Sequence, residues 1–103
     1  MQRMLRSEDI GVAGKINRFR GYLKIEDDVA VFQIEYLESS GAAINFHRVL
    51  GSMRRLAVRH DVSQIRVEAA IANMKLLMML SRKLGAPTPG SDSTFMDTWT
   101  FDV

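Results

Sequence analysis

Hydrophobic and polar positions alternate in two neighbouring segments of the first half of the chain. Residues 21–26 and 29–37 are rich in Val, Ile, Phe and Tyr, and the polar pair Asp27-Asp28 separates them. This pattern predicts two strands that pair as an antiparallel hairpin. Strict alternation puts Ala30, Phe32, Ile34 and Tyr36 on one face of the second strand, and Val31, Gln33 and Glu35 on the other. Residues 1–15 show no comparable period and are expected to be irregular.

The spacing of apolar residues becomes helical after the small residues Ser39-Ser40-Gly41. A Ser hydroxyl can accept a hydrogen bond from an unpaired backbone N–H, so this segment suits the start of a helix. Apolar residues then recur at steps of three and four from Ala42 to about Arg59, which predicts an amphipathic helix. Gly51 lies inside this helix at a cost of about 1 kcal/mol relative to Ala. We interpret it as a point of close packing.

Three further elements complete the predicted fold. Residues 64–71 read as a strand, 73–84 as a helix that Asn73 caps and Gly85 stops, and 94–103 as a terminal strand. A right-handed crossover should place the strand around Val67 beside the one around Ile34, and parallel to it.

We therefore predict a single domain over residues 1–103 with an α/β (α+β) fold. Its mixed sheet should contain a β-hairpin followed by helix, strand, helix and strand.

Composition limits the classes of protein and of site. The 103 residues are 47% hydrophobic and 25% charged, as in ordinary globular domains. The sequence has no Cys, which excludes disulfides and thiolate metal sites and fits a reducing compartment, so we expect a cytoplasmic protein. No apolar run approaches the roughly 18 residues of a membrane span, and we expect no membrane partner. His47 and His60 have no acidic partner at helical spacing, so we expect no metal.

Charge and apolar residues are both concentrated on the predicted helices. No acidic residue lies between Glu38 and Asp61, where the chain has four arginines: Arg48, Arg54, Arg55 and Arg59. This segment is either a solvated helix face or a surface for an anion. Aromatic residues are not interleaved with these arginines, which argues against a nucleic-acid partner. The helix over 73–84 is apolar on more than one side and rich in methionine, which suits either a core or a protein partner.

The junction of residues 38–43 has the clearest functional chemistry. A strand ends in small residues and a helix starts at once, so several backbone N–H groups and the positive end of the helix dipole are exposed. Such a junction suits a phosphate or a pyrophosphate, although an ordinary strand–helix turn has the same sequence features.

Taken in order, these elements resemble the second half of the GNAT superfamily of N-acetyltransferases. In that family a loop of pattern Gln/Arg-x-x-Gly-x-Gly/Ala holds the pyrophosphate of acetyl-CoA, and Glu38-Ser39-Ser40-Gly41-Ala42-Ala43 occupies its place here. The strand around Val67 and the helix from Asn73 to Gly85 follow at similar spacing, so the resemblance covers residues 20–103. Glu38 replaces the usual Gln or Arg, Ala86 replaces a Phe, and the Tyr of the last helix is missing.

The resemblance implies acetyl transfer from acetyl-CoA to an amine. Glu35 would take the proton of the amine, directly or through water, and Ser81 would protonate the leaving thiolate. The implied cofactor-binding residues are Tyr36, Leu37, Glu38, Ser39, Ser40, Gly41, Ala42, Ala43 and Asn73. The helices that build the acceptor pocket in the family have no counterpart here, so a homodimer that completes the pocket is expected.

Two alternatives stay open beside this function. A non-catalytic interaction module of the same fold would use the methionine-rich helix or the terminal strand as its interface. A nucleic-acid binder would use the four arginines of the first helix, and its binding should weaken steeply as salt rises.

Overall fold

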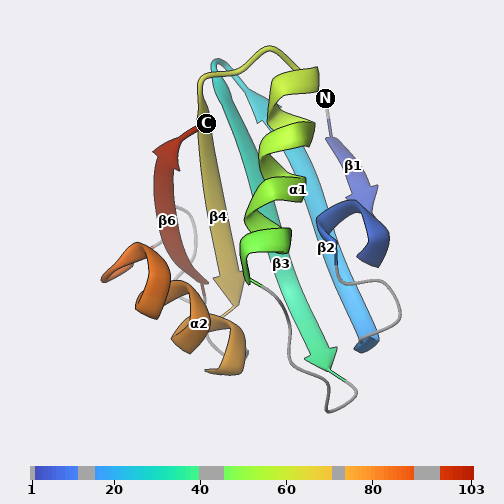
Figure 1. Ribbon diagram of the computed structural model, residues 1–103, viewed down its shortest axis with the longest axis vertical. Coiled ribbons are helices and arrows are strands. Elements are labelled where there is room, and N and C mark those ends of the chain that lie inside the picture. The colour runs from blue at the N-terminus through green and yellow to red at the C-terminus, as the bar shows by residue number, and fades with distance from the viewer. Residues whose placement is uncertain (1, 12–15, 40–45, 71–73, 90–95) are drawn as a thin grey trace.

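The computed structural model describes residues 2–11, 16–39, 46–70, 74–89 and 96–103. These residues form short and long strands, two α-helices and one 3-10 helix, η1 (Figure 1). In chain order the elements are β1 (Gln2–Leu5), η1 (Ser7–Ile10), β2 (Ile16–Glu26), β3 (Val29–Ser39), α1 (Phe46–Arg59), β4 (Gln64–Ala70), α2 (Met74–Leu84), β5 (Thr88–Pro89) and β6 (Met96–Asp102).

The strands form one six-stranded mixed sheet in the order β1-β2-β3-β4-β6-β5. The β2–β3 pair is the predicted antiparallel hairpin. The β3–β4 pair is parallel, with Phe32 beside Val67 and Ile34 beside Ala69, which confirms the predicted crossover through α1. β6 lies antiparallel between β4 and β5. The small α+β fold with a mixed sheet and two helices is therefore the predicted one, with β1 and β5 added at its edges.

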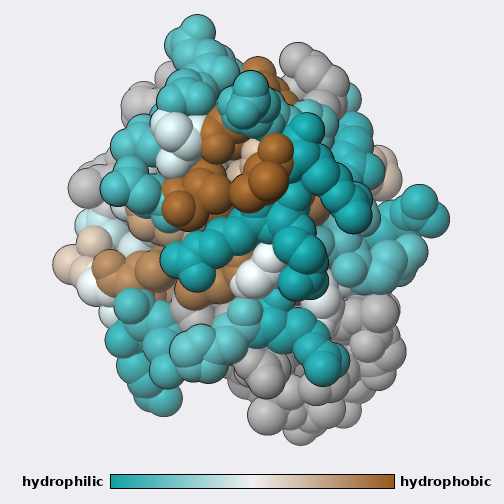
Figure 2. Space-filling view, turned by 45° about the horizontal axis from the view of Figure 1, so that its top comes forward, coloured by the Kyte–Doolittle hydropathy of each residue, from teal (hydrophilic) through white to brown (hydrophobic). Residues whose placement is uncertain are grey.

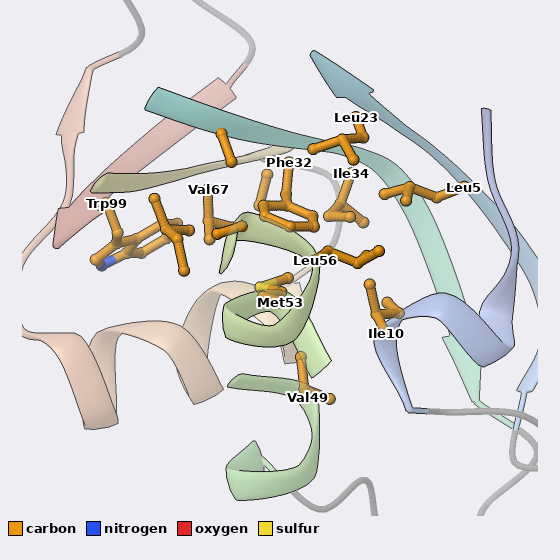
Figure 3. Packing of buried hydrophobic residues seen from close by; sticks show 14 of the residues in the cluster. Leu5, Ile10, Leu23, Phe32, Ile34, Val49, Met53, Leu56, Val67 and Trp99 are labelled. Carbon is orange, nitrogen blue, oxygen red and sulfur yellow. The ribbon is translucent and has the colours of Figure 1, made fainter. Parts of the chain in front are cut away.

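The hydrophobic core lies between one face of the sheet and the helices. Alternate residues of the strands, such as Phe32, Ile34 and Val67, point to this side and are buried. They meet Met53 and Leu56 of α1, whose apolar residues recur at helical spacing (Figure 3). Figures 1 and 3 show α1, α2 and η1 on the same side of the sheet, which we call the helix-covered face. We call the opposite side the open face.

The first residues of the chain are more regular than their sequence predicts. β1 pairs with β2, and η1 follows it, with a hydrogen bond from the Arg6 backbone N–H to the Asp9 side-chain carboxylate at 2.8 Å. Leu5 and Ile10 are both buried in the core. The expectation of an irregular segment is wrong for the described residues 2–11, because one strand and one turn of helix are too short to show a period.

The second helix is anchored at its C-terminal end. Gly85 has a φ of 88° and its N–H donates to the Ser81 carbonyl at 3.0 Å, so it ends α2 as predicted. The indole N–H of buried Trp99 donates to the Gly85 carbonyl at 2.9 Å and ties this end to β6. Leu80 is buried, whereas Met78 is 57% exposed, so the helix is core on one side only. Neither described helix is both long and apolar enough to cross a membrane.

Candidate functional site

The pairing of the parallel strands β3 and β4 stops before β3 ends, and the candidate site lies at this point of the sheet. Their pairing runs from Val29–Gln64 to Ile34–Ala69, β4 ends at Ala70, and β3 continues beside β2 to Ser39. In Figure 1 the arrowheads of β3 and β4 lie well apart. We call this part of the sheet, residues 35–39 with Ala70, the β3–β4 edge. Ligands in open α/β sheets bind at the carboxyl ends of such strands, where the following helices begin.

A β-bulge lies at the start of this edge. Arg20 pairs with Tyr36 and Gly21 pairs with Ile34, so Glu35 is an extra residue of β3 with no counterpart in β2. A bulge interrupts strict alternation. Tyr36 therefore lies opposite Arg20 on the open face, and Glu35 lies on the same face. The prediction that Tyr36 and Glu35 lie on opposite faces of the strand is wrong. Bulges often lie next to binding sites because they redirect side chains and backbone groups.

Glu35 is held by an arginine on the open face. Its Oε2 is 3.0 Å from the Arg20 Nε, and this Nε also donates to the Tyr22 hydroxyl at 3.1 Å. The hydrogen bond that Arg20 donates to Tyr22 and the charge of Glu35 raise the pKa of the Arg20 guanidinium. The Glu35 side chain remains 37% exposed, so a polar molecule can reach it from the open face.

A second arginine lies further along the edge. The guanidinium carbon of Arg18 is 5.0 Å from the centre of the Tyr36 ring, and Arg18 pairs in register with Glu38. Arg18 and Tyr36 thus lie on the open face together.

The rest of the open face is a network of charged and polar side chains. Arg66 contacts Glu26 at 2.8 Å and Glu68 at 3.8 Å, and the Gln33 amide donates to Glu68 at 3.4 Å. Val31 is buried on this face, where Lys24 and Arg66 flank it in register, and long basic side chains commonly lay their apolar stems over such a residue. A sheet with one packed and one polar face is typical where antiparallel strands dominate.

The structure brings together only part of the predicted site. Glu35, Tyr36, Leu37, Glu38 and Ser39 are consecutive residues of the β3–β4 edge, with Leu37 packed against the core. The predicted residues outside the described ones are Ser40, Gly41, Ala42, Ala43 and Asn73.

Ser81 and Glu35 lie on opposite sides of the sheet. Ser81 is half-buried on α2, which packs on the helix-covered face, whereas Glu35 is on the open face. One reacting group could not touch both side chains without passing through the sheet. The structure therefore does not unite the two predicted catalytic residues.

Sequence reasoning missed the bulge and the open-face arginines Arg18 and Arg20. Gly21, which stands at the bulge, is the one signal that could have indicated it, because a glycine inside a strand often marks a bulge. Among the described residues, no group of three or more His, Asp or Glu side chains is placed to hold a metal ion. Comparisons of the chain with models of protein families, with curated proteins and with solved structures find no match.

Proposed function

We propose that the chain is a minimal GNAT-like domain that binds acyl-CoA at the β3–β4 edge and transfers its acetyl group to an amine. One observation carries this proposal: the pairing of β3 with β4 stops at Ile34–Ala69, and β3 continues beside β2 with a bulge at Glu35. The strand order supports it too, because the hairpin and the parallel crossover through α1 agree with the order of elements that the resemblance implies.

The chemistry assigned to this edge is direct transfer. The bound cofactor supplies an acyl group as a thioester. The amine nitrogen attacks the thioester carbon, the C–S bond breaks, and the thiolate leaves with CoA. Glu35 accepts the proton that the amine loses, and backbone groups of β3 around Tyr36 orient the thioester. We assign no role to Ser81, because α2 lies on the other side of the sheet from Glu35.

The diphosphate of the cofactor would lie at the start of α1. The N-terminal end of a helix carries exposed N–H groups and a partial positive charge, which suit an anion. Arg18 adds a full positive charge at the same end of the sheet. We further propose a cytoplasmic protein that acts as a homo-oligomer, in which a second copy completes the acceptor pocket on the open face.

Calorimetric titration with acetyl-CoA and with CoA tests the binding step. We expect binding in the micromolar range, and Gly41→Asp should abolish it because the new carboxylate repels the diphosphate. Ala86→Asp, which adds the same charge at an exposed position after α2, is the matched control and should bind normally. No binding at millimolar ligand would remove this function. A non-catalytic interaction module, supported by the exposed Met78, would then be the better explanation.

Release of free thiol in the presence of primary amines such as lysine and polyamines tests the chemical step. Glu35→Gln should lower turnover by about 10²-fold and leave the affinity for acetyl-CoA nearly unchanged, because a general base acts in the transition state. Glu26→Gln is the control, since Glu26 is also a glutamate paired with an arginine on the sheet, but at the far end of β2. Normal turnover of Glu35→Gln would eliminate Glu35 as the base.

A further inference from the structure

The helix α1 has basic residues and no acidic ones. α1 contains Arg48, Arg54, Arg55 and Arg59 and no acidic residue. The whole chain has 14 basic and 12 acidic residues, so the remainder has 10 basic and 12 acidic residues and a net charge of −2. The overall charge of the rest of the chain therefore does not attract a polyanion, whereas the local charge of α1 does.

The arginines of α1 lie on its outward side. Val49, Met53, Leu56 and Ala57 are buried against the sheet, whereas all four arginines are exposed. Arg48, Arg55 and Arg59 are seven and four residues apart, so they share one side of the helix and span about 16 Å along its axis. Arg54 lies on the neighbouring side, next to β6. The arginines thus form an elongated basic surface, which we call the α1 arginine surface.

Three of these charges are not neutralised within the described part of the protein. All the ion pairs there involve residues of the sheet or of the segment from Arg6 to Glu8, and none involves Arg54, Arg55 or Arg59. Arg55 donates to the Ser52 hydroxyl at 3.0 Å, and the Arg54 guanidinium carbon lies 5.9 Å from the centre of the Phe101 ring. These contacts orient the guanidinium groups but leave their charge available to a partner.

We propose that the α1 arginine surface binds the phosphate backbone of a nucleic acid. Guanidinium groups bind phosphate oxygens with two parallel hydrogen bonds, and α1 has four arginines and no lysine. The contacts involve phosphates rather than base edges, so binding is independent of nucleotide sequence. The aromatic residues that base stacking would require are not needed for this mode.

Two other anionic partners fit the surface less well. Protein interfaces depend on buried apolar anchors, and among the described side chains of α1 only Val58, at 65%, is a strongly exposed large apolar residue. Figure 2 shows hydrophobic residues in the middle of this view, bordered by hydrophilic ones. A membrane-binding helix inserts its apolar face, but that face of α1 is already packed in the core.

Fluorescence anisotropy with labelled oligonucleotides of about 20 nucleotides tests this proposal, using single-stranded RNA in one arm and duplex DNA in the other. The unmodified protein should bind at low salt, and the logarithm of its affinity should fall with the logarithm of salt concentration with a slope of about −2 to −3 for three arginines. R54Q/R55Q/R59Q should lower the affinity roughly tenfold or more and remove most of this slope.

The matched control is R3Q/R82Q/K83Q, which removes the same charge at exposed positions of β1 and α2. It should bind nearly as well as the unmodified protein. Single variants R54Q and R59Q leave the Arg55–Ser52 bond intact and should each lower the slope by about one unit. If circular dichroism shows that the triple variant does not fold, the salt slopes of these two single variants test the proposal instead.

Three results would overturn the assignment. The first is absence of binding to either oligonucleotide at low salt. The second is an equal loss of affinity in R3Q/R82Q/K83Q, which would mean that overall charge is responsible. The third is equally tight binding of poly-glutamate at the same salt concentration, which would identify an acidic protein as the partner. Tighter binding in one arm of the experiment supports the proposal and identifies the form of nucleic acid.

Discussion

Asp28 joins the hairpin turn to the start of β4 through both its backbone and its side chain. Its carbonyl accepts from the N–H groups of Ser63 and Gln64 at 3.1 and 3.2 Å. One carboxylate oxygen accepts from the Ser63 N–H at 3.0 Å, and the other accepts from the Ser63 hydroxyl. A single turn residue therefore fixes where β4 begins relative to β3.

Asp28→Asn should destabilise the protein by about 1 kcal/mol. The amide is neutral and has one oxygen in place of two, so the charge-assisted hydrogen bonds from the Ser63 N–H and hydroxyl to the carboxylate are lost or replaced by weaker neutral ones. Chemical denaturation measures the free energy of unfolding. Asp27→Asn is the control, because it removes the same charge and Asn tolerates the left-handed φ of 52° found there, so its change should stay within about 0.5 kcal/mol. Equal losses in both variants would mean that turn charge, not the Ser63 contacts, is what matters.

Single residues also show where the sequence pattern no longer predicts which face of a strand a side chain lies on. The alternation of Ala30, Phe32 and Ile34 correctly predicts the packed face of β3. It fails at Tyr36, because the inserted Glu35 shifts the alternation by one residue. A bulge depends on how β2 and β3 pair, so a pattern read along one strand cannot contain it.

Among the elements, α1 contains a glycine that packing does not explain. A Cβ at Gly51 would meet only the Arg55 Nη1, at 3.7 Å, which is an ordinary contact. The interpretation of Gly51 as a point of close packing is therefore wrong. The close approach is at Gly11, where a Cβ would lie 2.8 Å from both the Arg48 Cγ and the Ser52 Oγ.

Gly51→Ala should stabilise the protein by about 0.5 to 1 kcal/mol, because it removes the backbone entropy of a glycine inside a helix at no steric cost. Gly11→Ala should destabilise it by about 1 kcal/mol or more, because Gly11 also has a φ of 72°. Thermal unfolding followed by circular dichroism compares the two. A lower midpoint for Gly51→Ala would show that the outward side of α1 is covered in solution.

Long elements were predictable and short ones were not. α1, β4 and α2 each extend over enough residues for their period to show. Their bounds among the described residues agree with the predicted ones to within one residue, and the predicted helix start at Ala42 lies outside those residues. β1, η1 and β5 have four, four and two residues, and only tertiary contacts define them. Leu5 and Ile10 are core residues that no local pattern distinguishes from isolated apolar residues.

At the scale of the whole molecule, the position of the candidate site along the chain could be predicted from the sequence, but the arrangement of its side chains could not. The junction after β3 could be located from its small residues. Which side chains share a face, and that Glu35 and Ser81 lie on opposite sides of the sheet, depend on the order of strands and on where α2 packs. These are properties of the assembled sheet.

The two proposed surfaces meet only at the first turn of α1, where Arg48 lies, and Arg54, Arg55 and Arg59 should act independently of the cofactor site. The β3–β4 edge involves the carboxyl ends of the strands, whereas the α1 arginine surface faces outward along the helix, away from the sheet. R54Q/R55Q/R59Q should therefore retain acetyl-CoA affinity within about threefold, because charges separated by more than about 10 Å are largely screened at ordinary salt. Gly41→Asp should retain its salt-dependent binding of oligonucleotides in the same way.

Calorimetry and anisotropy on the same four preparations, including the unmodified protein and R3Q/R82Q/K83Q, check this independence. Loss of both activities in one folded variant would mean that the cofactor phosphates and the oligonucleotide use the same arginines, since coupling between two sites must appear in both affinities. If each variant loses only one of the two binding activities, this small domain has two separate binding surfaces, one where β3 and β4 stop pairing and one along α1.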